Sequence, residues 1–342
     1  MDRILNVAAI AGGVNTPGRR FRIAALKPYL MENNISVKEI CPKISTYPPN
    51  NRLLRFPWIV AAFLERLTFL HRAKGFEAVI LQRELISTLP TLENLLPKPM
   101  ILDVDDAIYL NRKGKAAVHA ARSSSLIVCG NHYLAEKFSQ WNSNVTVIPT
   151  GVDTRQLYPR TEKIAQDKRV LGWIGTSANY EYLKNIKPAL EKTLKQNPLA
   201  KLQIISDKSP KFLKEFGLQL DFRKWYSGIE NELLPRFDVG IMPLTDSEWA
   251  RGKCAFKMLQ YMAAGVPVVA SPVGVNADLF ASGSIGLAAV NNDEWAESMS
   301  SLLDSSVEAR NMGLNGRKLV EQDYSLSIVS EKWKLALTNL LS

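Results

Sequence analysis

Two clusters of charged residues in this chain have types and spacing that suit ligand binding. In the first, Lys253 and Lys257 stand beside Gly252 at the expected start of a helix. The free N–H groups and positive dipole end of a helix attract anions, and two cations there would oppose the dipole unless an anion were bound. The pattern predicts a diphosphate site, with a ligand-free strand–helix–strand unit as the alternative.

The second cluster consists of three carboxylates, Asp103, Asp105 and Asp106, at the end of the apolar run 100–104. In an open parallel sheet, ligands bind outside the carboxyl ends of the strands, so these side chains are expected in the binding crevice. An Asp-x-Asp pair could also hold a metal-bound diphosphate. Because the lysine cluster already forms a nucleotide-site pattern, we expect no metal; capping of the next helix is the remaining alternative for Asp105 and Asp106.

Alternating apolar runs and helical patterns predict an α/β protein with doubly wound parallel sheets. Around the lysine cluster, the runs 238–243 and 266–271 indicate buried strands, and Gly265 suits the left-handed end of the helix between them. Further strands are expected at 3–10, 35–41, 78–82, 100–104, 126–131, 144–153, 170–174, 202–206 and 285–290, and helices at 19–31, 52–74, 230–236, 293–303, 308–323 and 328–341.

The composition is that of a globular protein. Its 342 residues, 46% hydrophobic and 22% charged, are enough for two domains. No apolar run is long enough to span a membrane, and the first residues do not resemble a signal peptide, so a cytoplasmic location is expected. Cys41, Cys129 and Cys254 are far apart in sequence and histidines are few, which predicts neither disulfides nor a zinc site.

The formal net charge of +10 predicts a negatively charged partner, such as a phosphorylated substrate, an anionic lipid surface or nucleic acid. Nucleic acid is disfavoured, because the basic residues are dispersed without interleaved aromatic residues. The stretch 52–74 combines arginines with apolar residues at helical spacing and could lie on a membrane surface. Packing inside a domain core is the favoured explanation of the same apolar residues.

The stretch 251–276, which contains the lysine cluster, resembles the C-terminal signature of the retaining family-4 glycosyltransferases. That signature has a Glu, seven residues, a second Glu, and then Ala-Met-Ala-Ala-Gly-x-Pro-Val-Val-Ala-Ser; residues 262–271 here are Met-Ala-Ala-Gly-Val-Pro-Val-Val-Ala-Ser. Gly252 and Gln260 stand at the two Glu positions. The resemblance implies that Gln260 bonds the ribose, whereas Gly252 cannot contact the sugar. A subset of the family has Gly-Lys-x-x-Phe-Lys here, as does this chain.

The segment 144–153, which ends in Val-Ile-Pro-Thr-Gly-Val-Asp, resembles the passage between the two domains of the same family. The resemblance implies a GT-B fold, with two Rossmann-like domains facing a cleft. The expected parts are an acceptor domain at 1–160, a nucleotide-sugar donor domain at 161–325, and a helix at 326–342 that crosses back to the first domain. The polar segment 155–168 is the expected linker.

The loop after the first strand contains Gly12 and Gly13, which would let a ligand approach the backbone. The resemblance implies that this loop faces the cleft near the donor and the acceptor. Arg19, Arg20 and Arg22 would then present cations there. A solvated basic helix start is the alternative.

Two other segments of the expected donor domain are assigned by the resemblance. The turn formed by Gly175, Thr176 and Ser177 would meet the donor phosphates or sugar through backbone N–H groups. Tyr226 and Ile229 stand where such enzymes hold the base. An Arg and a Lys that usually grip the diphosphate are absent, and the lysine cluster is expected to replace them.

The function implied by the resemblance is transfer of a hexose-type sugar from a nucleoside diphosphate donor to an acceptor hydroxyl, with retention and without a cofactor. Asp105 and Asp106 take the place of a His-Asp pair beside the acceptor and the donor sugar. No strong protein base is evident, which fits mechanisms in which the departing diphosphate takes the acceptor proton. The expected setting is cell-surface polysaccharide or glycolipid assembly, on a saccharide or lipid-linked acceptor at the inner face of the membrane.

Two rival functions remain. A GT-B protein that has lost catalysis and serves as a nucleotide-sugar sensor or scaffold would explain the missing Glu residues and the missing Arg/Lys pair. A nicotinamide-dependent oxidoreductase is disfavoured, because the loop after the first strand lacks the dinucleotide fingerprint and its acidic ribose residue. Donor hydrolysis or sugar transfer by the purified protein separates the enzyme from the sensor.

Overall fold

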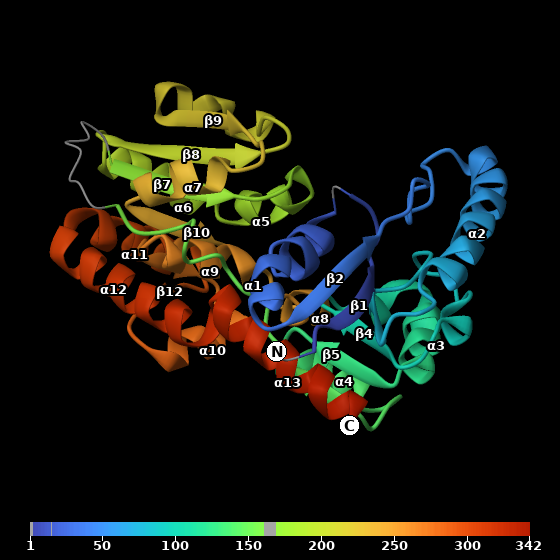
Figure 1. Cartoon of the computed structure of the whole chain (residues 1–342). Helices are drawn as coiled ribbons and strands as arrows, with labels where there is room; N and C mark the ends of the chain where they lie inside the picture. The colour runs from blue at the N-terminus through green and yellow to red at the C-terminus, as the bar shows by residue number, and fades with distance from the viewer. Residues whose placement is uncertain (1–2, 15, 161–168) are drawn as a thin grey trace. The chain divides into compact units, whose positions relative to one another are not determined.

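The computed structural model describes residues 3–14, 16–160 and 169–342, and the chain divides into two units (Figure 1). The first unit comprises Met1–Gly151, Gly252–Cys254 and Leu326–Ser342, and the second comprises Val152–Arg251 and Ala255–Ser325. Residues 161–168 of the expected linker, and Asn15 in the first glycine loop, lie outside the described residues.

The first unit is built on a six-stranded parallel sheet in the order β2-β1-β3-β4-β5-β6. Its strands are β1 (Leu5–Ile10), β2 (Ile35–Ile40), β3 (Ala78–Gln82), β4 (Met100–Val104), β5 (Leu126–Cys129) and β6 (Val145–Val147). β3, β4 and β5 are buried throughout, as expected of central strands covered on both faces. The order reverses between β1 and β3, so the loops after these two strands lie at the switch point where ligands bind.

The first unit contains both α-helices and shorter helical turns. They are η1 (Arg19–Ala24), α1 (Lys27–Glu32), η2 (Arg52–Leu54), α2 (Arg55–Arg72), η3 (Glu93–Leu95), η4 (Ile108–Gly114), α3 (Lys115–Ser123), α4 (His132–Phe138) and α13 (Leu326–Leu341). The helix expected at 19–31 is therefore divided into a π-helical turn and a short α-helix. Leu326, Trp333 and Leu337 of α13 join the core formed by β1 and β4, which ties the end of the chain to this unit.

The second unit contains a six-stranded parallel sheet in the order β12-β11-β10-β7-β8-β9. Its strands are β7 (Arg169–Ile174), β8 (Ala200–Ser206), β9 (Leu220–Lys224), β10 (Val239–Met242), β11 (Val268–Ala270) and β12 (Gly286–Ala288). Numbered from β7, this is the order 3-2-1-4-5-6 of nucleotide-binding Rossmann folds, with its switch point between β7 and β10. Successive residues of a strand face opposite sides of the sheet, so Leu171 and Trp173 join one core while Val170 and Ile174 join the other.

The helices of the second unit are η5 (Ser177–Asn179), α5 (Tyr180–Asn185), α6 (Lys187–Gln196), η6 (Lys211–Gln219), α7 (Ile229–Leu233), η7 (Leu234–Arg236), α8 (Glu248–Arg251), α9 (Phe256–Ala263), α10 (Val275–Ser282), α11 (Asn292–Asp304), α12 (Ser306–Leu319) and η8 (Val320–Tyr324). α9 ends as expected at Gly265, which has a φ of 68°. The N–H groups of Gly265 and Val266 bond the carbonyls of Met262 and Tyr261, which closes the helix in a Schellman motif.

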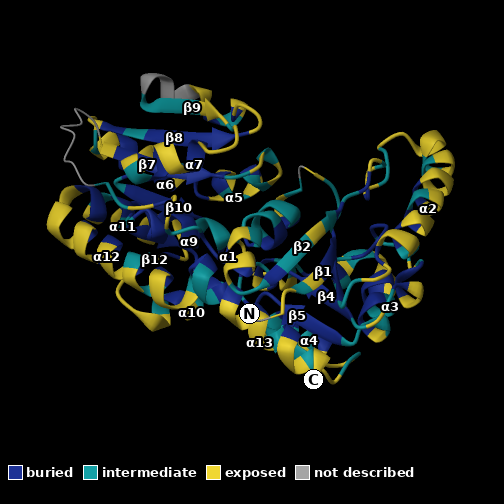
Figure 2. Cartoon of the chain, in the orientation of Figure 1, coloured by how far each residue is buried: buried dark blue, intermediate teal, exposed yellow. Residues whose placement is uncertain are grey.

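The favoured explanation of the stretch 52–74, packing in a domain core, is wrong. In α2 only Ala62, Arg66 and Phe69 are buried, and most of the large apolar residues are exposed (Figure 2). The reason is that the inner side of α2 bonds the loop residues Lys43, Ile44 and Leu85 through Glu65 and Arg66. Among the residues that the structure describes, no helix is long and apolar enough to cross a membrane.

Candidate functional site

In the first unit, Arg83 brings the two candidate catalytic carboxylates together. β3 and β4 are parallel neighbours in which Gln82 pairs with Asp103, so the residues that follow both strands emerge at the same edge. Arg83 Nε donates to Asp105 Oδ1 at 2.8 Å, and Arg83 Nη2 donates to Asp106 Oδ2. Gln82 Nε2 also donates to Asp105 Oδ1, at 3.2 Å. These side chains bond Arg83 rather than the start of the next helix, so the capping alternative does not describe them.

The surroundings move the pKa values of these two carboxyl groups in opposite directions. Burial by itself would raise the pKa of Asp105, but the charge and hydrogen bond of Arg83 outweigh it and lower that pKa. Burial and the neighbouring Asp105 charge raise the pKa of Asp106, against the attraction of Arg83 and Lys253. The side chains of Asp105 and Asp106 remain 15% and 22% exposed. Two carboxyl groups with divergent pKa values at a strand end are a common arrangement in active sites.

Asp103 does not belong with these two. It is fully buried and forms an ion pair with Arg22, whose Nε lies 3.1 Å from Asp103 Oδ2. Arg22 also donates to the carbonyl of Ile148 at 2.9 Å and to Thr150 Oγ1 at 3.3 Å. The expectation that Arg22 presents a cation to a ligand is therefore wrong, because its charge is neutralised inside the unit. Burial raises the pKa of Asp103 even beside this arginine.

The segment Gly252–Cys254 belongs to the first unit and packs beside the carboxylates. Asn131 Nδ2 donates to the Lys253 carbonyl at 3.1 Å, and the Cys254 thiol donates to the Asp105 carbonyl at 3.3 Å. A Cβ on Gly130 would lie only 2.3 Å from the Cys254 sulfur, so glycine is required for this contact. Burial raises the pKa of Cys254 to about 12, which leaves the thiol protonated and unreactive.

The helix that was expected to start near Gly252 starts later. α9 begins at Phe256, after Ala255 in a left-handed conformation with a φ of 50°. Lys253 consequently precedes the helix and lies in the first unit, whereas Lys257 lies in its first turn in the second unit. The expectation of two lysines on successive helical turns is wrong, because a strained residue interrupts the chain between them.

In the second unit, Lys257 and Gly175 are brought together. The Lys257 ammonium lies 4.4 Å from the centroid of the Trp173 ring, a cation–π contact. A Cβ on Gly175 would lie 2.5 Å from Lys257 Nζ, so the missing side chain makes room for this cation. Gly175 directly follows β7, at the switch point of the Rossmann sheet. A positive charge thus stands at the edge where this fold binds phosphates.

The turn after Gly175 has a carboxylate beside it. Asp207 accepts the backbone N–H of Ser177 at 2.6 Å and its hydroxyl at 2.9 Å. Thr176 is exposed, with Asn179 Nδ2 donating to its hydroxyl at 3.0 Å. Since the Ser177 N–H already has an anionic partner, a phosphate would have to displace Asp207 to bond it.

Gln260, Tyr226 and Ile229 occupy different surroundings in this unit. Gln260 is buried on α9, one turn after Lys257. Tyr226 is 52% exposed, and its hydroxyl donates to Glu232 at 2.6 Å. Ile229 belongs to the hydrophobic core, so a base could contact its backbone but not its side chain. Among the donor-site residues predicted in this unit, Lys257 and Gly175 are the pair that the described geometry places next to each other.

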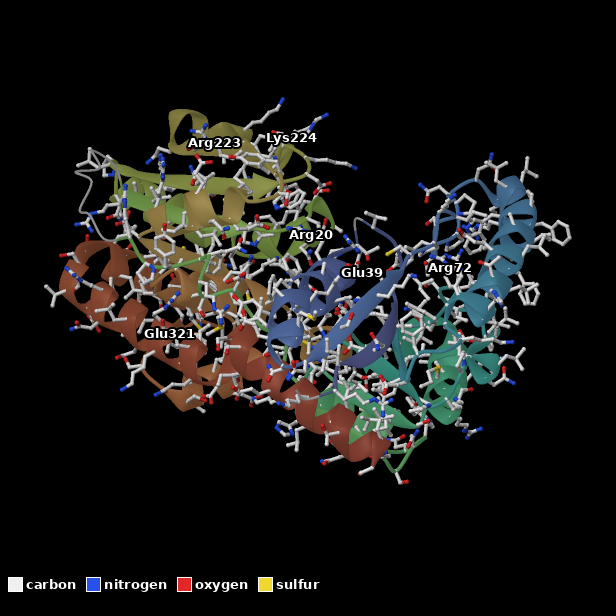
Figure 3. The ribbon with its side chains drawn as sticks, in the orientation of Figure 1. Arg20, Glu39, Arg72, Arg223, Lys224 and Glu321 are labelled. Atoms are coloured by element: carbon white, nitrogen blue, oxygen red, sulfur yellow. The ribbon has the colours of Figure 1, made fainter. Side chains whose placement is uncertain are left out.

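The glycine loop of the first unit follows β1 at that sheet's switch point. The Gly12 carbonyl accepts the Thr46 hydroxyl at 2.7 Å, and the Gly13 carbonyl accepts the Thr16 hydroxyl at 2.9 Å. Arg19 forms an ion pair with Glu39, with 2.5 Å between Nε and Oε2. Figure 3 labels Glu39 and Arg20 on the same part of the unit. These bonds tie the described loop residues Gly12, Gly13 and Thr16 to their neighbours; the role of the loop toward a ligand stays a prediction.

Sequence reasoning missed several residues that build these sites. Arg83 and Gln82 end or follow a buried strand next to the one that precedes Asp105, and that position could have identified them. Asp207 likewise follows β8. Trp173 had no such signal, because an aromatic residue inside a strand looks like any core residue. In the parts of the chain that the structure describes, no three acidic, histidine or cysteine side chains are grouped to hold a metal ion.

Comparisons with known proteins agree with this geometry. Residues 168–305 match the sequence profile of the family described as glycosyl transferases group 1. No curated protein matches the sequence significantly. Sucrose-phosphate synthase from Thermosynechococcus elongatus superimposes with a TM-score of 0.74 at 14% identity, covering 98% of this chain and 99% of that one.

Two further solved structures have the same fold. HepE from Anabaena, solved with UDP and glucose, gives a TM-score of 0.73 at 12% identity over 98% of this chain and 99% of its own. WaaG, a glycosyltransferase involved in lipopolysaccharide biosynthesis, gives a TM-score of 0.70 at 13% identity. The match covers 97% of this chain and 99% of WaaG. The family match over residues 168–305 indicates a glycosyltransferase, and the structural likeness shows that the whole chain has the GT-B fold.

Proposed function

We propose that the protein transfers a sugar, with retention of its anomeric configuration, from a nucleoside diphosphate donor to a hydroxyl of a saccharide or lipid-linked acceptor. Two relatives support the substrate classes: HepE was solved with UDP and glucose, and WaaG acts in lipopolysaccharide biosynthesis. The proposed setting is the cytoplasmic side of an anionic membrane, in cell-surface polysaccharide or glycolipid assembly. The proposal involves no metal and no cofactor.

The observation that carries this proposal is the Lys257 ammonium beside Gly175 at the switch point of the second unit. A cation in the first turn of a helix opposes the helix dipole, and a bound diphosphate would relieve that repulsion. Gly175 has no side chain of its own, which lets the Lys257 ammonium lie close to the backbone at this edge of the sheet. The proposed donor site adds Gln260 toward the ribose, Thr176 and Ser177 toward the phosphates or sugar, and Tyr226 with the Ile229 backbone toward the base.

In the first unit, Asp105 and Asp106 are proposed to orient sugar or acceptor hydroxyls, held in place by Arg83. In the transfer, the bond between the anomeric carbon and the diphosphate oxygen breaks, and a bond from that carbon to the acceptor oxygen forms. The acceptor proton passes to the departing diphosphate. The protein would contribute by positioning both partners and by stabilising the negative charge of the leaving group.

The nucleotide site can be tested by thermal shift and calorimetry with UDP, GDP, ADP and their sugars, because a ligand that binds the folded state stabilises it. Lys257→Met removes the charge that lies over Trp173 but keeps an unbranched side chain. We expect it to weaken nucleoside diphosphate binding by about 1.5–3 kcal/mol, the range for a charged hydrogen bond. Lys195→Ala, at an exposed position on α6, is the control. Unchanged affinity in Lys257→Met would exclude this phosphate site, and Lys253→Met tests the other predicted lysine separately.

The carboxylate pair can be tested by the kinetics of Asp105→Asn. Loss of one charged contact made only in the transition state should lower turnover by roughly 10- to 150-fold, while donor affinity stays unchanged. The anomeric configuration of the product, read by NMR, tests retention. If turnover required manganese or magnesium bound at Asp105 and Asp106, the metal-free mechanism would be wrong. Nucleotide binding without hydrolysis or transfer would favour the sensor function.

A further inference from the structure

Helix α2 and the 3-10 turn before it expose a continuous apolar surface. Leu53 is 84% exposed, Phe56 76% and Leu64 57%. At 100° per residue, Phe56, Val60 and Leu64 fall on one side of the helix. The complete set of exposed large apolar residues here is Leu53, Leu54, Phe56, Ile59, Val60, Phe63, Leu64 and Leu67, which we call the α2 apolar face. An exposed surface of this kind indicates an interaction site.

The opposite side of α2 is attached to the first unit by polar contacts. Arg66 is fully buried and donates to the carbonyls of Leu85, at 3.3 Å, and Ile44, at 2.9 Å. Glu65 accepts the backbone N–H groups of Lys43, at 2.7 Å, and Ile44, at 3.1 Å. Turning the α2 apolar face inward would break these bonds and expose the partners of a buried cation. The helix is therefore held with its apolar side outward.

The charges around the α2 apolar face are positive. Arg52 and Arg55 stand at its N-terminal end, and Arg72 and Lys74 at its C-terminal end; Arg72 is labelled in Figure 3. Glu65 is the one acidic residue of the stretch 52–74, and it bonds backbone N–H groups on the inner side. The surface is thus an apolar strip with cations at both ends, a pattern that complements an anionic surface covering an apolar layer.

We propose that α2 is the membrane-docking element of this protein and lies in the plane of an anionic bilayer, with its apolar face among the acyl chains. A helix with one apolar side and one polar side suits binding in the membrane interface. The polar inner side of α2 contains Glu65 and Arg66, which bond the rest of the unit. Basic residues at both ends would contact lipid phosphates. The inference rests on the proposed function in one respect: the membrane is where the enzyme would meet a lipid-linked acceptor.

Co-sedimentation of the whole protein with vesicles tests the docking element without requiring catalysis. We expect binding to vesicles of phosphatidylcholine mixed with phosphatidylglycerol, weaker binding to phosphatidylcholine alone, and loss of binding as salt rises. Phe56→Ser combined with Phe63→Ser should reduce the partition coefficient by about tenfold or more. Arg52→Gln combined with Lys74→Gln should reduce it by about fivefold for each charge, on mixed vesicles only.

The matched control is Val307→Ser combined with Leu314→Ser, which removes exposed apolar residues from α12 in the second unit. It should leave vesicle binding unchanged. Equal binding of the control and the Phe56/Phe63 variant would overturn the proposal. So would concentration-dependent dimers of the wild type that the Phe56/Phe63 variant abolishes, because the face would then bind a second copy. If the protein transferred sugar to a soluble acceptor but did not bind vesicles, the membrane-docking proposal would be wrong and the proposed function would stand.

Discussion

Helices α2 and α9 both have apolar residues at three-and-four spacing, yet those of α9 are buried and most of those of α2 are exposed. In α9 every residue from Met258 to Ala263 is buried, and Leu259 and Met262 belong to the core of the second unit. In α2 most of the large apolar residues are exposed and an arginine is fully buried. Figure 2 shows the exposed residues along α2.

The difference follows from what each helix packs against. α9 connects β10 to β11, two neighbouring parallel strands, and such a crossover places the helix on the apolar face of the sheet. α2 packs on the loops at 43–46 and 85, whose free backbone groups demand polar partners. A helical apolar stripe therefore identifies one side of a helix, but the neighbouring surface decides whether that side is buried.

The largest expected difference between the two helices is the loss of stability when a large apolar residue is shortened. Leu259→Ala in α9 should lower the free energy of unfolding of the second unit by about 2–5 kcal/mol, because it removes buried methyl groups. Leu64→Ala, its counterpart on the exposed side of α2, should change the stability of the first unit by no more than about 0.5 kcal/mol. Urea unfolding of both variants measures this. Equal losses would mean that the α2 apolar face is packed in solution.

A similar effect is expected when the polar anchor of α2 is removed. Arg66→Met should lower stability by about 2–4 kcal/mol, since at least two carbonyl acceptors lose a charged donor at about 1–3 kcal/mol each. Hydrogen exchange should show that the amides of α2 lose protection first. Arg72→Met, on the same helix at an exposed position, is the control and should leave that protection intact.

A third prediction concerns the pH dependence of stability that arises from Glu84. Burial raises the pKa of Glu84 to about 7, and no described group bonds its Oε1 atom. The folded state then binds more protons than the unfolded state between pH 4.5 and 7, so this group lowers stability as pH rises through that window. Glu84→Gln, which mimics the protonated form, should therefore be more stable than wild type at pH 8 by roughly 2–3 kcal/mol, at about 1.36 kcal/mol per pKa unit.

The difference between Glu84→Gln and wild type should shrink toward pH 4.5, where both states of the wild type bind the proton. Glu136→Gln, at an exposed position on α4, is the matched control. Denaturant unfolding across the pH range measures both. A constant difference at every pH would show that Glu84 is ionised in the folded protein.

The residues of the candidate site illustrate how far sequence reasoning reaches. Asp105 and Asp106 could be selected because residues that follow a buried parallel strand emerge at the ligand edge of a sheet. Arg83 obeys the same rule but is recognised only when β3 and β4 are known to be neighbours. The start of α9 was misplaced because the left-handed Ala255 has no sequence signature: alanine favours helices, and only its surroundings hold it in this conformation.

By itself, the sequence determined the α/β class, the buried strands and the left-handed glycine that ends α9, because these depend on local periodicity and on the conformational freedom of single residues. The family signature in 251–276 was equally local. The tertiary structure alone decided that Arg22 is neutralised by Asp103, that Lys257 lies against Trp173 beside Gly175, and that the α2 apolar face is exposed. Each of these depends on which distant segments become neighbours, and charge neutralisation and burial are properties of neighbours rather than of residue types.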